Sequence, residues 1–117
     1  MAENTRAKGG MGEAAAKKYL ESCGYKILET NFKTVFGEAD IIAEKDGVIV
    51  FCEIKSRASA AFGLPAEAVG ISKQQGYIKI AQSYISCRRA AGRDIRFDVI
   101  EILDGQINHI ENAFQKR

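Results

Sequence analysis

Residues 38–55 of this 117-residue chain read EADIIAEKDGVIVFCEIK, and this stretch decides the fold. It contains two runs typical of strands, 38–45 and 48–55, separated only by Asp46 and Gly47. An Asp-Gly pair between two such runs is a strong signal for a two-residue β-hairpin turn. The sequence therefore predicts two adjacent strands joined by this turn.

The register of this hairpin would bring acidic side chains together. If the residues that flank the turn pair with each other, counting outward places Asp40 opposite Glu53 and Glu38 opposite Lys55. The two-residue period of a strand puts all four side chains on one face. Directly opposed carboxylates destabilise a sheet, so a divalent cation, a shared proton or a neighbouring ammonium must offset their repulsion. Lys55 supplies such an ammonium.

These charges have two interpretations. Strands often carry solvated surface charges, and Glu-x-Lys occurs by chance in many proteins. However, Val48–Cys52 is an unbroken apolar run, as in a strand buried on both faces of a sheet. An acid and a lysine at the end of such a strand are costly to bury without partners, and perturbed ionisable groups gather at functional sites. The sequence therefore favours a functional carboxylate cluster over a solvated pattern.

Short motifs are spread along almost the whole chain. In order they are Gly12–Ala15, Gly24–Leu28, Gly37–Asp40, Phe51–Arg57, Phe62–Gly63, Ala68–Val69 with Lys73, Arg96–Val99 and Ile110–Phe114. Together they resemble the YraN-like family, small bacterial proteins of the restriction-endonuclease-like PD-(D/E)XK superfamily. The chain departs from the family pattern at three positions, none of them an expected site residue: Ala39, Cys52 and Gly70.

The resemblance implies a restriction-endonuclease-like fold with a metal-dependent nuclease site. Asp40 and Glu53, helped by the Ile54 carbonyl, would hold Mg²⁺ or Mn²⁺, cations that accept hard oxygen ligands. Lys55 would position the attacking water and stabilise negative charge near it.

Two further acids have alternative roles. Glu13 matches the helix acid that members of the superfamily often place near the metal, which would add it to the catalytic residues. Alternatively, Glu13 forms an exposed i,i+4 pair with Lys17. Glu38 would hold the Lys55 ammonium across the hairpin, or it forms a surface ion pair of little energetic value.

The distribution of charge is more informative than the net charge of +2, which is too small to indicate nucleic-acid binding by itself. No acid occurs between Glu67 and Asp94. Residues in this stretch, together with Arg57, are candidates for contacts to phosphate groups: Arg57, Lys73, Gln74, Gln75, Lys79, Arg88, Arg89 and Arg93. The alternative is a solvated helix face that happens to be basic.

The whole chain predicts an α/β fold, with a central mixed sheet flanked by helices in the order α-β-β-β-α-β-β. Helices are expected over residues 10–23 and 72–92, and a loop over 58–70. The remaining strands are expected over residues 25–32, 95–103 and 106–110. We predict one domain over residues 10–117, preceded by a flexible arm over residues 1–9.

Several classes of protein are excluded. The three cysteines are odd in number and lack Cys-x-x-Cys spacing, so neither a disulfide framework nor a zinc site is indicated. No segment reaches the ~20 apolar residues of a membrane span, and residues 1–10 contain no signal peptide, which leads us to expect a cytoplasmic protein without membrane contact. Asp98 and the single histidine, His109, are expected to be structural.

Two functions remain. The first is a metal-dependent nuclease acting on DNA, including branched or damaged DNA, which the intact set of Asp40, Glu53 and Lys55 favours. The second is a nucleic-acid-binding module that keeps the fold but does not cleave, which the small net charge and short chain favour. A homodimer would reconcile these observations, because a two-fold pair doubles the basic surface.

Overall fold

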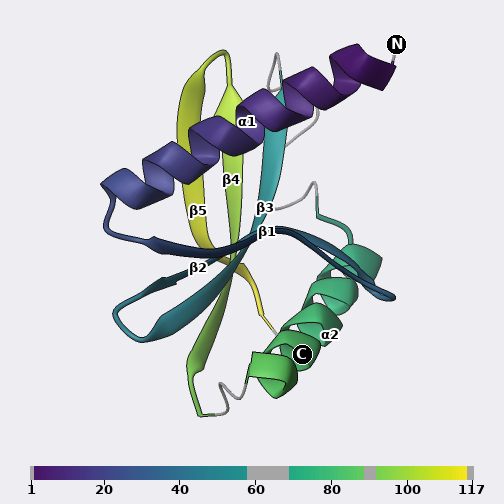
Figure 1. The fold of residues 1–117 in the computed structure, drawn as a ribbon, viewed down its shortest axis with the longest axis vertical. Coiled ribbons are helices and arrows are strands. Elements are labelled where there is room, and N and C mark those ends of the chain that lie inside the picture. Colours follow the sequence, from purple (N-terminus) through teal and green to yellow (C-terminus); the bar gives the residue numbers. More distant parts are fainter. Residues whose placement is uncertain (1, 58–68, 89–91, 116–117) are drawn as a thin grey trace.

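The computed structural model describes residues 2–57, 69–88 and 92–115, and the side chains of residues 12–56, 69–87 and 92–115. The elements in chain order are α1 (Ala2–Ser22), β1 (Lys26–Thr34), β2 (Gly37–Lys45), β3 (Val48–Arg57), α2 (Ile71–Arg88), β4 (Asp94–Leu103) and β5 (Gln106–Phe114) (Figure 1). This order confirms the predicted α/β fold. Most of the predicted loop, residues 58–68, lies outside the described residues.

The five strands form one mixed sheet in the order β1-β2-β3-β4-β5. β3 and β4 are parallel, joined through α2, and the other neighbours are antiparallel. The predicted hairpin register is confirmed, with pairs running from Lys45–Val48 to Ile41–Cys52. At the turn, Asp46 and Gly47 have φ angles of 53° and 80°. Both values are left-handed, as a type I′ turn requires, which is why Asp-Gly forms it readily.

The two helices cover opposite faces of the sheet, α1 on one and α2 on the other (Figure 1). The apolar run of β3 is buried between them. Ile49 and Phe51 pack in the cluster that includes the α2 residues, whereas Val50 and Cys52 pack in the cluster that includes the α1 residues. A strand that is buried on both faces has no polar alternation, which explains the continuous apolar sequence. None of the described helices is long and apolar enough to cross a membrane.

Several element boundaries differ from the sequence prediction, among them the start of α1 and the end of β5. α1 begins at Ala2, so residues 2–9, for which we expected a flexible arm, continue the helix. Ala, Glu, Arg and Lys in this segment are strong helix formers, and each glycine lowers helix stability by only about 1 kcal/mol. β5 continues past Ile110 to Phe114, where it pairs with Phe97 after a register shift. The bulge hides the strand period that sequence patterns detect.

The hairpin of β1 and β2 bends at Asp40. Ala39 and Ile42 both pack in the α2-side cluster, so the alternation of β2 is interrupted between them. Asn31, across the hairpin, has a left-handed φ of 52°. The outer part of the hairpin therefore reaches α2 (Figure 1), where a Cβ added at Gly76 would lie 3.0 Å from the Phe36 carbonyl oxygen. The bend sets the position of Asp40 beside β3.

Candidate functional site

Asp40 and Glu53 lie together on β2 and β3, as the hairpin register predicts. Asp40 Oδ2 accepts a hydrogen bond of 2.8 Å from the backbone nitrogen of Ile54, the residue after Glu53. Glu53 is only 2% exposed, although it carries an ionisable group. A buried carboxylate requires compensating partners.

Three donors on the α2 side of the sheet provide this compensation. Tyr77 donates its hydroxyl hydrogen to Glu53 Oε1 across 2.7 Å. Lys55 Nζ lies 3.4 Å from Glu53 Oε2, and Lys73 forms a second ion pair with the same oxygen. Lys73 and Tyr77 are four residues apart in α2, so one helix face presents both to the carboxylate.

The two acids have pKa values that move in opposite directions. Burial raises the pKa of Asp40 to about 7, and repulsion from Glu53 adds to this, while the hydrogen bond from Ile54 and the charge of Lys73 oppose it. Burial also acts to raise the pKa of Glu53, but hydrogen bonds from Lys73, Tyr77 and Asp40 outweigh it and lower the pKa. Below about pH 7 Asp40 therefore holds a proton beside an ionised Glu53.

This donor set fits a hard divalent cation. Two carboxylates with the neighbouring Ile54 carbonyl offer only oxygen ligands, and Mg²⁺ typically uses one or two protein carboxylates together with waters and substrate phosphates. Within residues 2–57, 69–88 and 92–115, no three His, Cys, Asp or Glu side chains come together in a metal-binding group. A metal bound here would therefore depend on Asp40 and Glu53 and on ligands from solvent or substrate.

Glu13 lies close enough to Glu38 for their two charges to interact. Asn31 Nδ2 donates a hydrogen bond of 2.6 Å to Glu13 Oε1. Burial raises the pKa of Glu13, and the charge of Glu38 raises it further. Ala39 packs on the α2 side, so the adjacent Glu38 points to the α1 side. The prediction that Glu38 shares a face with Lys55 is therefore wrong, because the bend in β2 interrupts the strand period.

The predicted phosphate-contacting residues have different surroundings. Lys73 pairs with Glu53, and Gln74 donates to the Val69 carbonyl at 2.8 Å. Lys79 Nζ lies 5.4 Å from the centre of the Phe36 ring. Gln75 is exposed. The side chains of Arg57 and Arg88, and all of Arg89, lie outside the described residues.

Arg93, the last residue of this set, forms an ion pair with Glu44 and donates from Nε to the Gly47 carbonyl at 3.4 Å. No acid lies between Glu67 and Asp94 in the sequence, but acids from other elements pair with Lys73 and Arg93 in the folded structure. Acids from β2 and β3 neutralise the charges at both ends of this segment.

Tyr77 was missed as a site residue, because its helical spacing with other apolar residues predicted only a core position. Its ring does occupy the core, where it is 1% exposed. Its hydroxyl group also reaches Glu53, and a second contact of 3.3 Å to the Cys52 carbonyl holds it there. The signal available in the sequence was its spacing of four residues from Lys73.

A second polar cluster lies between α1, β4 and β5. Asp98 is fully buried and accepts hydrogen bonds from Arg96 and from the backbone nitrogen of Asn112, all at 2.9 Å. His109 Nε2 lies 2.6 Å from Asp98 Oδ2, and His109 Nδ1 lies 2.9 Å from the Tyr19 hydroxyl oxygen. These contacts satisfy both Asp98 and His109 and fasten α1 to the sheet, in agreement with the structural role that we expected.

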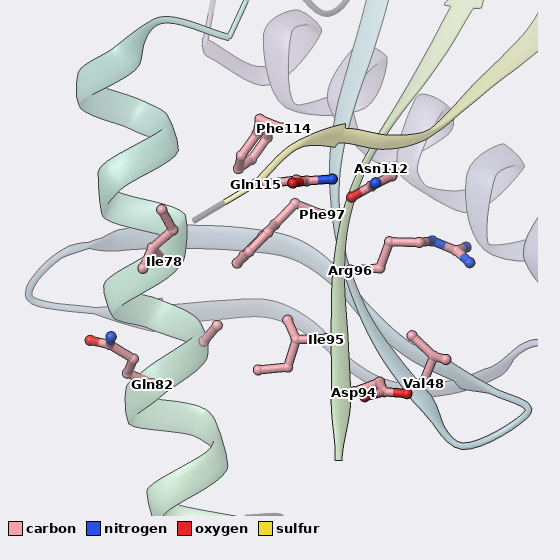
Figure 2. A pocket seen from close by; sticks show the side chains of 11 residues that line it. Val48, Ile78, Gln82, Asp94, Ile95, Arg96, Phe97, Asn112, Phe114 and Gln115 are labelled. Atoms are coloured by element: carbon pink, nitrogen blue, oxygen red, sulfur yellow. The ribbon is translucent and has the colours of Figure 1, made fainter. Parts of the chain in front are cut away.

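A cavity of about 620 Å³ opens between α2 and β4 (Figure 2). Its apolar walls include Ile78, Ala81, Ile95, Phe97 and Phe114. Arg96 also lines it, but Figure 2 shows the Arg96 side chain directed away from α2. None of the candidate site residues lines this cavity, so the cavity is separate from the site at Asp40 and Glu53.

The mixed five-stranded sheet between two helices, with acids on a hairpin and a lysine two residues after the second acid, is consistent with the restriction-endonuclease-like class of folds. The sequence model described as "Uncharacterised protein family UPF0102" matches residues 12–102. The chain belongs to this family, which confirms the resemblance to YraN-like proteins.

Curated relatives match over nearly their full length. A UPF0102 protein of Persephonella marina is 47% identical over 107 residues, which cover 92% of each chain. A UPF0102 protein of Caldanaerobacter subterraneus is 47% identical over 118 residues, covering 95% of this chain and 97% of the relative. A third, of Thermodesulfovibrio yellowstonii, is 51% identical over 106 residues, covering 91% and 94%.

Proposed function

We propose that this protein is a metal-dependent nuclease that hydrolyses DNA phosphodiester bonds in the cytoplasm, with branched or damaged DNA as its substrate. One observation carries the proposal. Asp40 and Glu53 lie side by side on adjacent strands, and the Lys55 ammonium lies 3.4 Å from the Glu53 carboxylate. Two acids and a lysine in this arrangement supply both a cation site and a positive group for a reacting phosphate.

Each residue would have a distinct role. Asp40 and Glu53, with the Ile54 carbonyl, would hold Mg²⁺ or Mn²⁺. When bound, such a cation lowers the pKa of water and neutralises charge on the phosphate. Lys55 would orient the attacking water and stabilise the negative charge that develops. Tyr77 fixes the carboxylate of Glu53 through a buried hydrogen bond.

Other residues would act around this centre. Glu13 remains a candidate for a further acid that acts on water near the site. Contacts to DNA phosphates would come from exposed basic side chains of α2 and the segment after it, among them Lys73, Lys79 and Arg93. A single chain of this size has little surface with which to span a duplex, and a homodimer would double its small basic surface.

A second candidate function is a nucleic-acid-binding module that does not cleave. It is favoured by the number of donors already on Glu53, because Tyr77, Lys55 and Lys73 all contact this carboxylate. The two lysines already contact Oε2, so a cation cannot bind this oxygen until one of them leaves.

The test is cleavage by the purified protein of linear, nicked, flapped and four-way DNA, and of RNA, with Mg²⁺ and with Mn²⁺. The proposed nuclease cleaves at least one DNA substrate, and the activity disappears with EDTA and in Asp40→Ala. Binding without metal-dependent cleavage on every substrate would establish the second function instead. Cleavage that persists in Asp40→Ala would identify a contaminating nuclease.

A further inference from the structure

Glu53 is shared among three donors that differ in how easily they can leave. Its Oε1 atom accepts from Tyr77, whose ring is 1% exposed and held by the core. Its Oε2 atom contacts both Lys55 and Lys73. An oxygen of a carboxylate has two lone pairs, so a cation that binds Oε2 must take the place of one of these two ammonium groups.

The two lysines are not equivalent. The side chain of Lys55 is 28% exposed and originates from β3, only two residues from Glu53. The side chain of Lys73 is 48% exposed and originates from the first turn of α2, which begins at Ile71. Lys73 can therefore move its ammonium into solvent by rotations of its own side chain, without any change in the sheet.

We propose that Lys73 is a displaceable counter-ion, whose ammonium neutralises Glu53 until a divalent cation binds Asp40 and Glu53 and releases it. This inference rests on the proposed function, because it takes these acids to be the cation ligands. The released ammonium stays within reach of the acidic pair, where it can bind the negatively charged phosphate of a nucleic acid. Lys73 therefore links the binding of a cation by Asp40 and Glu53 to the binding of the substrate.

The electrostatics of the site support this exchange. Like charges repel more strongly near a protein surface than in bulk water, and the double charge of a divalent cation doubles its repulsion from each ammonium group. A cation on Glu53 therefore cannot lie beside two ammonium groups without a large penalty. Because Tyr77 is neutral and buried, it remains bonded to Glu53 while Lys73 leaves.

The first test measures Mn²⁺ binding by calorimetry at mildly alkaline pH in wild type, Lys73→Met and Lys79→Met. Lys79 is a matched control, because it is an exposed lysine of the same helix that contacts the Phe36 ring instead of an acid. Loss of a charged competitor from Glu53 should strengthen Mn²⁺ binding about ten- to hundredfold in Lys73→Met. Lys79→Met should bind like wild type. Equal or weaker binding by a folded Lys73→Met protein would overturn the proposal.

The second test uses the wild-type protein, so that it does not depend on a variant. Reductive methylation with mass spectrometry measures the reactivity of each lysine with and without Mg²⁺. Release from Glu53 should increase the rate at Lys73 severalfold, with no change at Lys79. An unchanged rate at Lys73 under saturating Mg²⁺ would contradict displacement.

These measurements separate the two proposals. Tighter Mn²⁺ binding by Lys73→Met without any cleavage by wild type would support Lys73 as a displaceable counter-ion and contradict the proposed nuclease activity. Cleavage by wild type with unchanged Mn²⁺ affinity in Lys73→Met would do the reverse. If neither wild type nor Lys73→Met binds Mn²⁺, both proposals fail.

Discussion

The Tyr77 hydroxyl group donates to Oε1 of Glu53 across 2.7 Å, and this bond joins α2 to β3 inside the core. Hydrogen bonds to an ionised acceptor are stronger than neutral ones, especially where water is excluded. Tyr77 is 1% exposed and Glu53 is 2% exposed, so water cannot replace either partner. The bond therefore fixes the orientation of the carboxylate that Tyr77, Lys55 and Lys73 share.

Replacing Tyr77 with Phe should lower the free energy of unfolding by about 1–3 kcal/mol at neutral pH. The hydrogen bond from Tyr77 helps to lower the pKa of Glu53, so the pKa should rise in the variant. A carboxyl group whose pKa is lower in the folded state than in the unfolded state stabilises the fold at pH values above the unfolded-state pKa. This stabilisation is lost as the pH falls through the folded-state pKa. The effect of Tyr77→Phe should therefore be large at neutral pH and small in acid. Urea titrations at several pH values measure it.

Tyr25→Phe is a suitable control, because Tyr25 is also buried and its hydroxyl accepts a 2.5 Å hydrogen bond from Arg96 on the other side of the sheet. This variant should lose stability but keep any Mn²⁺ binding of the wild type. Equal stability of Tyr77→Phe and wild type at neutral pH would mean that the Glu53 bond contributes nothing.

Asp40→Asn should be more stable than wild type above pH 7 by about 1–3 kcal/mol. The pKa of Asp40 is raised from 3.8 to about 7. A carboxyl group whose pKa is higher in the folded state than in the unfolded state stabilises the fold at pH values below the unfolded-state pKa. This stabilisation is lost as the pH rises through the folded-state pKa. Wild type should therefore lose stability between about pH 4 and 7, whereas an asparagine, which resembles the protonated acid, should not.

Thermal melts of both proteins across this pH range provide the measurement. The same variant should lose Mn²⁺ binding, since an amide is a much poorer ligand than a carboxylate. Parallel stability profiles for Asp40→Asn and wild type would show that Asp40 titrates normally. Unchanged Mn²⁺ binding would remove Asp40 from the cation site.

The hairpin could be predicted because its determinants are local. Asp46 and Gly47 favour left-handed φ angles, and this fixes a register that extends to Ile41 and Cys52. Asp40 lies one residue beyond the last of these pairs, so its position next to Glu53 also followed from counting. Turn chemistry and strand period are therefore sufficient where neighbouring residues decide the structure.

The remaining features depend on elements that are distant in sequence. The bend that turns Glu38 away from Lys55 arises where the outer hairpin packs against α2, and no local pattern signals this contact. The ion pair between Arg93 and Glu44 crosses from the start of β4 to β2, so an acid-free stretch of sequence did not become a free basic surface. The contact of the Tyr77 hydroxyl with Glu53 could not be predicted, because the helical spacing of Tyr77 with apolar residues indicates only a core position.

Lys79 and Arg93 should differ in their effect on nucleic-acid binding, because their charges have different partners. Lys79 lies over an aromatic ring, while Arg93 is paired with Glu44. Lys79→Gln should weaken binding to all sequences and reduce the slope of log K against log salt by about 1. Arg93→Gln should change this slope less, since Glu44 already neutralises it.

Fluorescence anisotropy with one labelled duplex over a range of salt concentrations measures both slopes. A matched double variant, Arg93→Gln with Glu44→Gln, shows whether the ion pair itself affects the fold. If Lys79→Gln binds as tightly as wild type at every salt concentration, the exposed face of α2 does not contact phosphate.

Lys55→Met distinguishes a catalytic lysine from a structural one. Glu53 keeps Lys73 and Tyr77 as partners in this variant, so the protein should fold and melt within a few degrees of wild type. Mn²⁺ binding should remain or become stronger, because a positive charge has been removed from the site. Cleavage should fall by about a hundredfold or more, the scale typical of losing one electrostatic catalytic group. A cleavage time course and a thermal melt on the same sample decide the question, with Lys26→Met, at an exposed lysine of β1, as the control. Unchanged cleavage by a folded Lys55→Met protein would exclude a catalytic role, whereas a large loss of stability would show that the ammonium mainly compensates the buried acids.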